Sequence, residues 1–366
     1  MSTDDAALAR IRDRIDEVDR ELLKLLSERA GLALEVGKVK QAHQDGEAPV
    51  YFRPEREAQI LTRLKERNRG PLSDRDVARL FREIISCCLS LEHPLSVAYL
   101  GPPGTYTEMA ALAQFGQFAQ TEPMASIDEV FREVETEQTH YGVVPVENST
   151  EGMVNHTLDC FMEAPPEVKV CAEVELPIHQ AFLVHPENDG KLERIVSHAQ
   201  SLAQCRGWLD TNYPGVERVA VASNAEAARQ VSGNSGLAAV AGEIAARRYG
   251  LKVAADRIED RTDNKTRFLI IGRQHVGASG RDKTSILVST RNMPGALYRV
   301  LEPFHRHGIS LSRIETRPAR SGDWSYVFFI DFDGHQDDDT VQRTLAEVGE
   351  VALEVRRLGS YPRSVL

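Results

Sequence analysis

Residues 8–41 carry a pattern of apolar side chains that a long helix would place on one face. The seam positions are Ile11, Ile15, Val18, Leu22, Leu25, Leu32, Val36 and Val39. Their spacing alternates between four and three residues, which is typical of a helix packed against other helices. A helix over this span would be roughly 50 Å long at ~1.5 Å per residue. We expect residues 8–92 to be helical throughout, with two much shorter helices after this one. Because these cannot cover the whole seam, the pattern predicts a homodimer or higher homo-oligomer.

The two shorter helices are delimited by ordinary start and stop signals. The stretch at 42–52 breaks the first helix, and Pro54 suits the first turn of a second helix that reaches about Asn68. The stretch at 70–74 is the next break, with Ser73 or Asp74 as the N-cap of the third helix.

Arg29 occupies the seam position between Leu25 and Leu32. Burying its charge costs several kcal/mol unless it is paired, and an ion pair with a neighbouring glutamate is one explanation. A ligand is the other, because Lys40 lies 11 residues on, nearly on the same face and about 16 Å along the axis. The second helix begins with further charged residues at 56 and 57, and the third ends with an acid at 92. A charged set inside an apolar bundle favours a polyanionic ligand.

Length and composition narrow the class of protein. The 366 residues suffice for two or three domains, and the formal net charge is −11. No basic block stands out, so nucleic acid is not an expected partner. The N-terminus lacks the apolar core of a signal peptide, no apolar run reaches the ~18 residues of a membrane span, and the five cysteines fit neither a disulfide framework nor a zinc spacing. We therefore expect a cytoplasmic protein with reduced thiols and no membrane partner.

Two further segments follow the helical one. From 95 to 275, short apolar runs alternate with helical stretches, which predicts an α/β sheet with ligand groups at the carboxyl ends of its strands. From 283 to 360 the expected order is strand, helix, strand, strand, helix, strand, which fits a small α+β ferredoxin-like domain. The chain is thus expected to hold three domains, at 1–93, 95–275 and 283–360.

Polar side chains gather at the strand ends of the α/β segment. The three clusters are Glu147, Asn148 and Ser149; Ser197, Gln200 and Gln204; and Thr266 with Arg267. Taken singly, each is explained as a cap or a turn, as is Thr105 after the Gly/Pro turn at 101–104. Taken together with an arginine, these clusters favour the binding of a small polar carboxylate.

The helical segment resembles the all-helical chorismate mutases, especially the first domain of the bifunctional chorismate mutase–prephenate dehydratases. The matching stretches are 11–40, 53–61 and 80–92. The resemblance implies that Arg29, Arg56 and, from a second copy of the chain, Arg12 grip the two carboxylates of chorismate. It also implies that Lys40 and Glu92 face the ether oxygen, that Glu57 holds the substrate hydroxyl, and that Cys88 lines the site.

The implied reaction is a pericyclic rearrangement, which needs no nucleophile and no cofactor. The protein helps by fixing a compact conformer and by stabilising charge on the ether oxygen. Some relatives carry Gln where this chain has Glu92. Because a carboxylate cannot donate a hydrogen bond, Glu92 must carry a proton to act on that oxygen. Arg53 replaces the Asp of some relatives and Cys88 the Ser of others, so neither has an assigned role.

Most of 97–273 resembles prephenate dehydratase, most specifically in "NKTRF" at 264–268, "VPVENS" at 144–149 and "SHAQSLAQC" at 197–205. The resemblance implies two α/β lobes like those of periplasmic binding proteins, with prephenate losing CO2 and its ring hydroxyl between them. It implies that Thr266 assists departure of the hydroxyl and that Arg267 counters a substrate carboxylate. The remaining implied substrate contacts are Thr105, Asn148, Ser149, Ser197, Gln200, Gln204 and Phe268. Glu147 stays open between catalytic and supporting roles, and His198 is not assigned one.

The last segment resembles the ACT regulatory domain that follows prephenate dehydratases. In that family a "GAL" turn and an "ESRP"-like stretch meet across a dimer interface and bind phenylalanine. The matching residues are Gly295, Ala296, Leu297, Glu315, Thr316, Arg317 and Pro318, with Thr in place of the usual Ser. Read alone, the glycine suits a turn and Arg317 suits an edge strand.

The expected protein is a bifunctional enzyme of phenylalanine biosynthesis without cofactor or metal, whose small-molecule partners are chorismate, prephenate and phenylalanine. Two alternatives remain at this stage. One is a solute or amino-acid sensor that binds without turnover and whose helical segment serves only for dimerisation. The other is a dehydratase whose mutase domain is inactive, or one that prefers arogenate to prephenate.

Overall fold

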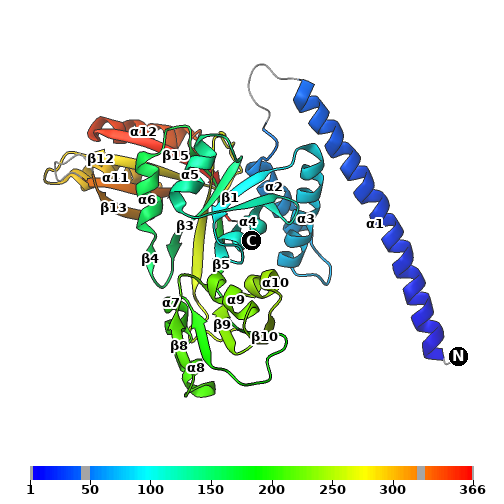
Figure 1. The fold of residues 1–366 in the computed structure, drawn as a ribbon. Helices are drawn as coiled ribbons and strands as arrows, with labels where there is room; N and C mark the ends of the chain where they lie inside the picture. The colour runs from blue at the N-terminus through cyan, green and yellow to red at the C-terminus, as the bar shows by residue number, and fades with distance from the viewer. Residues whose placement is uncertain (1–2, 43–49, 320–325, 365–366) are drawn as a thin grey trace.

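The computed structural model of the protein describes residues 3–42, 50–319 and 326–364, and Figure 1 shows its elements in chain order. The first three helices are α1 (Thr3–Ala42), α2 (Pro54–Arg67) and α3 (Asp74–Glu92). Pro54 occupies the first turn of α2, and the Ser73 hydroxyl caps α3 by accepting from the Asp76 amide. The three predicted helices are therefore confirmed, whereas most of the predicted break at 42–52 lies outside the described residues.

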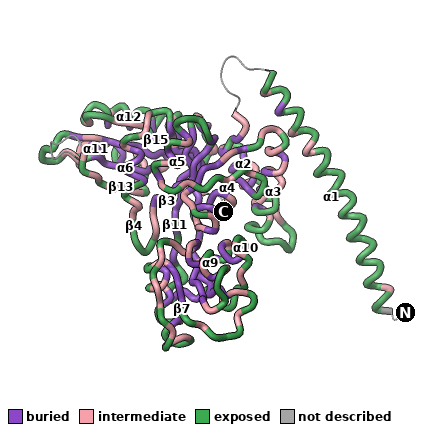
Figure 2. Tube along the Cα trace, viewed as in Figure 1, coloured by how far each residue is buried: buried purple, intermediate pink, exposed green. Residues whose placement is uncertain are grey.

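The apolar seam of α1 faces solvent in the single chain. Ile11 is 58% exposed and Leu25 is 59% exposed, and Figure 2 colours most of α1 as exposed. Only the C-terminal part of the helix approaches α3, where the Arg29 Nη1 atom lies 3.5 Å from the Ile84 carbonyl oxygen. Within the described residues nothing covers the seam between Ile11 and Leu25.

The middle of the chain forms two sheets, which we call lobe 1 and lobe 2. The strands of lobe 1 are β1 (Ser96–Leu100), β2 (Gln120–Met124), β3 (Tyr141–Asn148), β4 (Gly152–Met153), β5 (Lys169–Pro177) and β11 (Lys265–Gly272). Its helices are α4 (Tyr106–Phe115), α5 (Ile127–Glu135) and α6 (Asn155–Glu163). The strand order is β2-β1-β3-β11-β5, with β4 paired to β3.

Lobe 2 lies between β5 and β11 in the chain. Its strands are β6 (Ala181–Val184), β7 (Arg194–Ser197), β8 (Glu217–Ala220), β9 (Leu237–Ala241) and β10 (Lys252–Ala255), in the order β10-β6-β9-β7-β8. Its helices are α7 (Ala199–Gln204), α8 (Arg206–Asn212), α9 (Asn224–Ser232) and α10 (Glu243–Tyr249). The segments 178–180 and 256–264 cross between the lobes.

Lobe 1 is a mixed sheet, because β4 and β11 run antiparallel to β3. Strand β11 pairs antiparallel with both β3 and β5, while β1 is parallel to β2 and β3. The start of β11 therefore lies beside the carboxyl end of β3, with Thr266 opposite Asn148. The sequence analysis also missed β2, β4, β5 and β10. Strand β2 has almost no apolar residues, β4 is two residues long, and charged residues interrupt the apolar run of β5.

The third domain has the predicted order of elements: β12 (Asp282–Thr290), α11 (Ala296–Arg306), β13 (Leu311–Pro318), β14 (Tyr326–Asp333), α12 (Asp339–Val351) and β15 (Glu354–Pro362). Its antiparallel sheet runs β13-β14-β12-β15. One face packs on α11 and α12 through residues such as Val300, Phe304 and Leu345.

The other face of that sheet is part of the core of lobe 1. Leu287, Phe329 and Tyr361 belong to the same buried cluster as Val144 and Ile271 of lobe 1. Burying one such large side chain contributes about 1.5–3 kcal/mol, so the two domains are firmly joined. In Figure 1 this sheet lies beside lobe 1, on the side away from α1. None of the described helices has the length and apolar character needed to span a bilayer.

Candidate active sites

A cavity of about 430 Å³ lies between α1, α2 and α3. Its lining includes all but one of the residues predicted for the helical site: Arg29, Lys40, Arg56, Glu57, Cys88 and Glu92. Arg53 also lines it, while the predicted Arg12 does not. The volume is that of a small-molecule pocket, and its three arginines and one lysine outnumber its two glutamates, so its net charge is positive.

The acids of this cavity are already held by cations. The Lys40 Nζ atom donates to Glu92 Oε2 and to the Tyr51 carbonyl oxygen, each at 3.2 Å. Glu57 is buried, and its Oε1 atom accepts from Arg82 Nε at 2.8 Å. Burial raises the pKa of the Glu57 carboxyl, although the Arg82 guanidinium acts in the opposite direction. The pair fixes one oxygen of Glu57 and leaves the other to a ligand.

Arg82 is a residue that the sequence reading missed. Its Nη1 atom also donates to the Ala113 carbonyl of α4 at 2.6 Å, so it links the helical domain to lobe 1. Four residues separate Arg82 from both Ala78 and Ser86, which are buried on the same face of α3. An arginine at this helical spacing, on a face that is otherwise buried, is the sequence feature that could have identified Arg82.

A second constellation lies where β3 ends and β11 begins. Asn148 Nδ2 donates to Thr266 Oγ1 at 2.8 Å. Asn148 Oδ1 accepts from the amides of Thr150 and Glu151 at 3.0 and 3.2 Å, which fixes the orientation of the side-chain amide. Because Thr266 Oγ1 accepts from Asn148, its own proton must point elsewhere, and no acceptor for it is found among the described residues.

The neighbouring polar groups join this pair to lobe 2. Ser149 Oγ accepts from the Lys265 amide at 2.9 Å and lies 3.4 Å from Asn264 Oδ1. Asn264 Nδ2 in turn donates to Gln204 Oε1 of α7 at 3.4 Å. The structure thus brings the predicted Asn148, Ser149, Gln204 and Thr266 together. Asn264 belongs to the motif at 264–268 but was given no role from the sequence.

The side chains of other residues predicted for this site contact other parts of the protein. Three of them, Phe268, Ser197 and Arg267, are therefore not part of the proposed site. Phe268 is 1% exposed in the core of lobe 1. The Ser197 hydroxyl is buried against the Val240 carbonyl at 2.5 Å. Arg267 points away from Thr266, since neighbours on a strand face opposite sides of the sheet. The Thr105 hydroxyl caps α4 by accepting from the Glu108 amide and donates to the Leu100 carbonyl at 3.1 Å. Gln200 is half-buried on α7.

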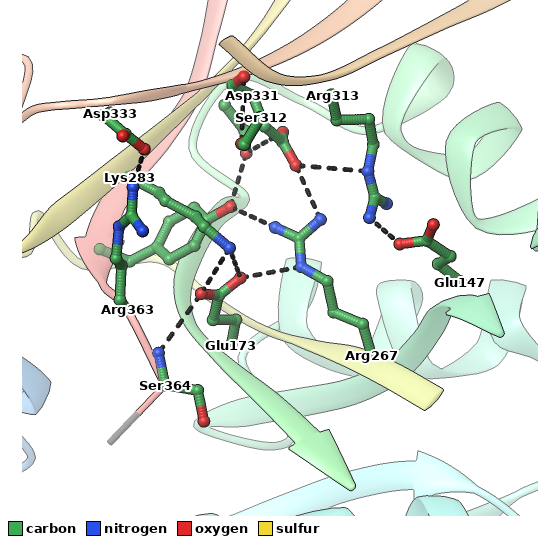
Figure 3. Close-up of polar contacts among 12 residues, drawn as sticks. Glu147, Glu173, Arg267, Lys283, Ser312, Arg313, Asp331, Asp333, Arg363 and Ser364 are labelled. Atoms are coloured by element: carbon green, nitrogen blue, oxygen red, sulfur yellow. Dashed lines mark hydrogen bonds and ion pairs between the residues drawn. The ribbon is translucent and has the colours of Figure 1, made fainter. Parts of the chain in front are cut away.

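Arg267 belongs to a buried ion-pair network between lobe 1 and the third domain (Figure 3). Its Nε atom donates to Glu173 Oε2 at 2.8 Å, Nη1 to Asp331 Oδ2 at 2.7 Å, and Nη2 to the Tyr361 hydroxyl at 2.9 Å. With two carboxylates already bound, its charge is compensated without a substrate. This is the physical reason that the predicted role of Arg267 is not supported here.

The same network includes the end of β3. Arg313 of β13 pairs with Glu147 and lies 3.9 Å from Asp331 Oδ2 (Figure 3). Of the two roles left open for Glu147, this contact favours support. Arg313 gave no sequence signal beyond lying close to the predicted phenylalanine segment.

The predicted phenylalanine residues lie on two elements of the third domain. Gly295 precedes α11 with a φ of 76°, which favours glycine, and Ala296 and Leu297 begin that helix. Glu315, Thr316, Arg317 and Pro318 end β13, an edge strand of the sheet. Arg317 forms two hydrogen bonds to Asp159 of α6, at 2.8 and 2.7 Å.

Two histidines and one cluster of possible metal ligands have no role in the proposed sites. His179 Nδ1 lies 2.7 Å from Glu259 Oε1, and His198 precedes α7. Among the described residues, Asp128, His156 and Cys160 form a cluster that could hold a metal ion. They lie on α5 and α6, and none belongs to the predicted sites.

Comparison with known proteins agrees with this division. The chain matches family models for chorismate mutase type II over residues 11–93, prephenate dehydratase over 97–276 and the ACT domain over 284–350. The fold and sites therefore define a multidomain enzyme with a helical mutase domain, a dehydratase domain and an ACT domain.

Two relatives match the chain from end to end. The chain is 56% identical over 365 residues to the bifunctional chorismate mutase/prephenate dehydratase of Pseudomonas aeruginosa, covering 99% of this chain and 100% of that one. It is 48% identical to the Neisseria gonorrhoeae protein of that name, over 100% of this chain and 99% of that one. The chain belongs to the bifunctional chorismate mutase/prephenate dehydratase family.

A solved structure is similar to most of the chain. The prephenate dehydratase of Arthrobacter aurescens, in complex with L-Phe, is 34% identical with a TM-score of 0.68. The match covers 74% of this chain and 90% of that one.

The interdomain network yields a prediction about acid stability. Burial acts to raise the pKa of Asp331, but Arg267, Ser285 and Arg313 lower it below its usual value. The folded state thus favours the carboxylate, so this stabilisation is complete above the ordinary carboxyl pKa and is lost as the pH falls through the folded pKa. Asp331→Asn should lower the free energy of unfolding near pH 7 by about 3–5 kcal/mol and should lessen its loss on acidification. Urea unfolding followed between pH 7 and 2 measures both effects.

Asp333→Asn is the matched control, because Asp333 lies two residues on in β14 and pairs with Arg363 near the surface. It should cost less than about 1 kcal/mol. An acid profile of Asp331→Asn that runs parallel to that of the unchanged protein would contradict the assignment.

Proposed function

We propose that this chain rearranges chorismate to prephenate in its helical domain and converts prephenate to phenylpyruvate between its two lobes, under feedback inhibition by phenylalanine. The observation that carries the proposal is the cationic cavity between α1, α2 and α3, in a chain that matches bifunctional relatives from end to end. A sensor that only dimerises has no use for such a cavity. Because its five cysteines are all free, we propose that the protein acts in the cytoplasm, where thiols stay reduced.

The mutase site acts through charge and shape. Arg29 and Arg56 bind the carboxylates of chorismate, and Glu57, oriented by Arg82, accepts from the substrate hydroxyl. Lys40 donates to the ether oxygen, which gains negative charge as its bond to carbon breaks. Glu92 can donate to the same oxygen only when it carries a proton, and Lys40 then turns from Glu92 to the substrate. Holding the compact conformer supplies the rest of the acceleration.

A second copy of the chain completes this site in our proposal. Arg12 lies on α1 17 residues before Arg29, or about 25 Å along the axis, so it cannot reach the cavity of its own chain. The exposed seam from Ile11 to Leu25 is the surface that a second α1 would cover. Pairing of two such helices would bury the seams and bring each Arg12 to the partner cavity.

The dehydratase site is built around Thr266. Loss of CO2 from prephenate sends an electron pair into the ring, and the ring hydroxyl leaves with a proton to form water. The Thr266 hydroxyl, polarised by the hydrogen bond from Asn148, donates its proton to that leaving group and regains one from solvent. Because aromatisation drives the reaction, this modest acid suffices. Ser149, Asn264 and Gln204 orient the substrate from both lobes. We propose that the lobes close on prephenate as in periplasmic binding proteins, since two segments cross between them.

Phenylalanine is proposed to bind the third domain, which we assign to the ferredoxin-like type from its order of elements. Gly295, Ala296 and Leu297 face the edge strand of a second copy, which supplies Glu315, Thr316, Arg317 and Pro318. The related Arthrobacter aurescens structure holds L-Phe, which supports this choice of effector.

The direct test gives purified protein chorismate and follows chorismate, prephenate and phenylpyruvate separately, with and without phenylalanine. Phenylpyruvate formation that phenylalanine suppresses is the expected result. Accumulation of prephenate alone would leave the two lobes as a sensor, and consumption of added prephenate without loss of chorismate would leave the helices as a dimerisation domain. Parallel rates with arogenate test the preferred substrate.

Replacement of Arg29 separates the two activities. Arg29→Ala should lower the mutase kcat/KM by about 100- to 1000-fold, since it removes a charged group from the cavity, and should leave the dehydratase rate unchanged. Arg20→Ala is the control, because Arg20 is exposed and donates to the Asp16 carbonyl of its own helix. An Arg29→Ala variant with full mutase activity would return this residue to a purely structural role.

Replacement of Thr266 should do the reverse. Thr266→Val removes the proton donor at nearly constant volume and should lower the dehydratase kcat by about 100-fold or more, whereas Thr266→Ser should keep most of it. Thr211→Val, at an exposed helix position of lobe 2, is the control. Mutase turnover measured on the same samples reports the amount of folded enzyme. Equal dehydratase rates for Thr266→Val and Thr211→Val would exclude Thr266 from the reaction.

A further inference from the structure

Strands β3 and β11 carry the proposed catalytic pair on one face and ionic anchors on the other. Thr266 pairs in register with Asn148, and Arg267 pairs with Glu147. Residues that are in register share a face, and their neighbours take the opposite one. The dehydratase site and the contacts to the third domain therefore occupy the two sides of the same four residues.

The anchors meet at one carboxylate of the third domain. Asp331 lies 2.7 Å from Arg267 Nη1 and 3.9 Å from Arg313 Nε, and Arg313 also pairs with Glu147 (Figure 3). The hydrogen bond from Asn148 to Thr266 closes a ring of six residues. We call this the coupling ring: Thr266, Arg267, Asp331, Arg313, Glu147 and Asn148.

Arg313 also connects the ring to the proposed effector segment. It lies on β13 two residues before Glu315, and alternate residues of that strand are half-buried. Arg313 and Arg317 thus share the face that meets lobe 1, one held by Glu147 and the other by Asp159. A ligand that shifts residues 315–318 must move or strain one or both of these ion pairs.

We propose that Arg313 of the third domain is a positioning residue of the dehydratase site. It holds Glu147, so that Asn148, the next residue, presents its side-chain amide to Thr266 Oγ1. Through the same guanidinium, phenylalanine bound at residues 315–318 lowers dehydratase turnover by loosening Glu147. This inference rests on the proposed function of both domains.

A double-mutant cycle tests the pair. Arg313 is 15% exposed and Glu147 is 37% exposed at the side chain, so both can be replaced with less damage than the buried Arg267. Arg313→Met and Glu147→Gln should each lower the dehydratase kcat roughly 3- to 30-fold with little change in KM for prephenate. The kcat of the double variant should be no lower than that of the less active single variant. Arg313→Lys, which keeps the charge, should recover part of the rate.

Inhibition gives a readout that a merely structural role would not move. In Arg313→Met, equilibrium dialysis should still detect phenylalanine binding. Inhibition of the dehydratase by phenylalanine should weaken by a factor similar to the loss of kcat. Arg343→Gln is the control, because Arg343 is exposed on α12 and donates to the Asp339 carbonyl of its own helix. Mutase turnover should be the same in every variant.

Each failure has its own signature. The inference would be overturned if Arg313→Met showed the same dehydratase turnover and the same inhibition by phenylalanine as Arg343→Gln. Additive losses of turnover in the double variant would also overturn it. An unchanged protein that does not consume prephenate would instead refute the proposed function, and the cycle would not be reached.

Discussion

The antiparallel pairing of β11 with β3 is the constraint on which the dehydratase half of the molecule depends. It sets the first residues of β11 against the last residues of β3, although more than 110 residues separate them in the chain. Lobe 2 is inserted between the two strands, so its α7 reaches the same edge through Gln204 and Asn264. A shift of this pairing by one residue would turn Thr266 to the face that meets the third domain and Arg267 to the face of Asn148.

The third domain packs against the same two strands. Its sheet shares one apolar cluster with lobe 1, and the buried Arg267 bridges Glu173 of β5 and Asp331 of β14. Removing one partner of such a buried pair leaves a charge without compensation, which costs several kcal/mol. The ACT domain is therefore part of the structural support of the strand ends that carry Thr266 and Asn148. The cavity of the helical domain has a separate link, since Arg82 joins Glu57 to the Ala113 carbonyl of lobe 1.

The parts of the site that sequence reasoning predicted are those that depend on short-range periodicity. Arg29 and Lys40 both line the cavity because 11 residues make nearly three helical turns. Thr266 and Asn148, which are hydrogen-bonded in the structure, were singled out because each lies in a short motif at a strand end. Arg267 was expected to counter a substrate carboxylate, whereas in the structure it is held by Glu173 and Asp331, because adjacent residues on a strand point to opposite faces. Strand β5 was missed because Glu173 and Glu175 interrupt its apolar run.

The sequence by itself determined the three domains, the long helix with its uncovered seam, the order of elements in the third domain and most of the charged residues of the mutase cavity. Helical phase, strand alternation and caps depend on residues within about a dozen positions, so they can be read along the chain. Only the tertiary structure decided that Asp331 and Arg313 reach Arg267 and Glu147, and that Arg82 holds Glu57. These contacts join residues between 25 and 166 positions apart, and they depend on how the sheets pack, which no local pattern encodes.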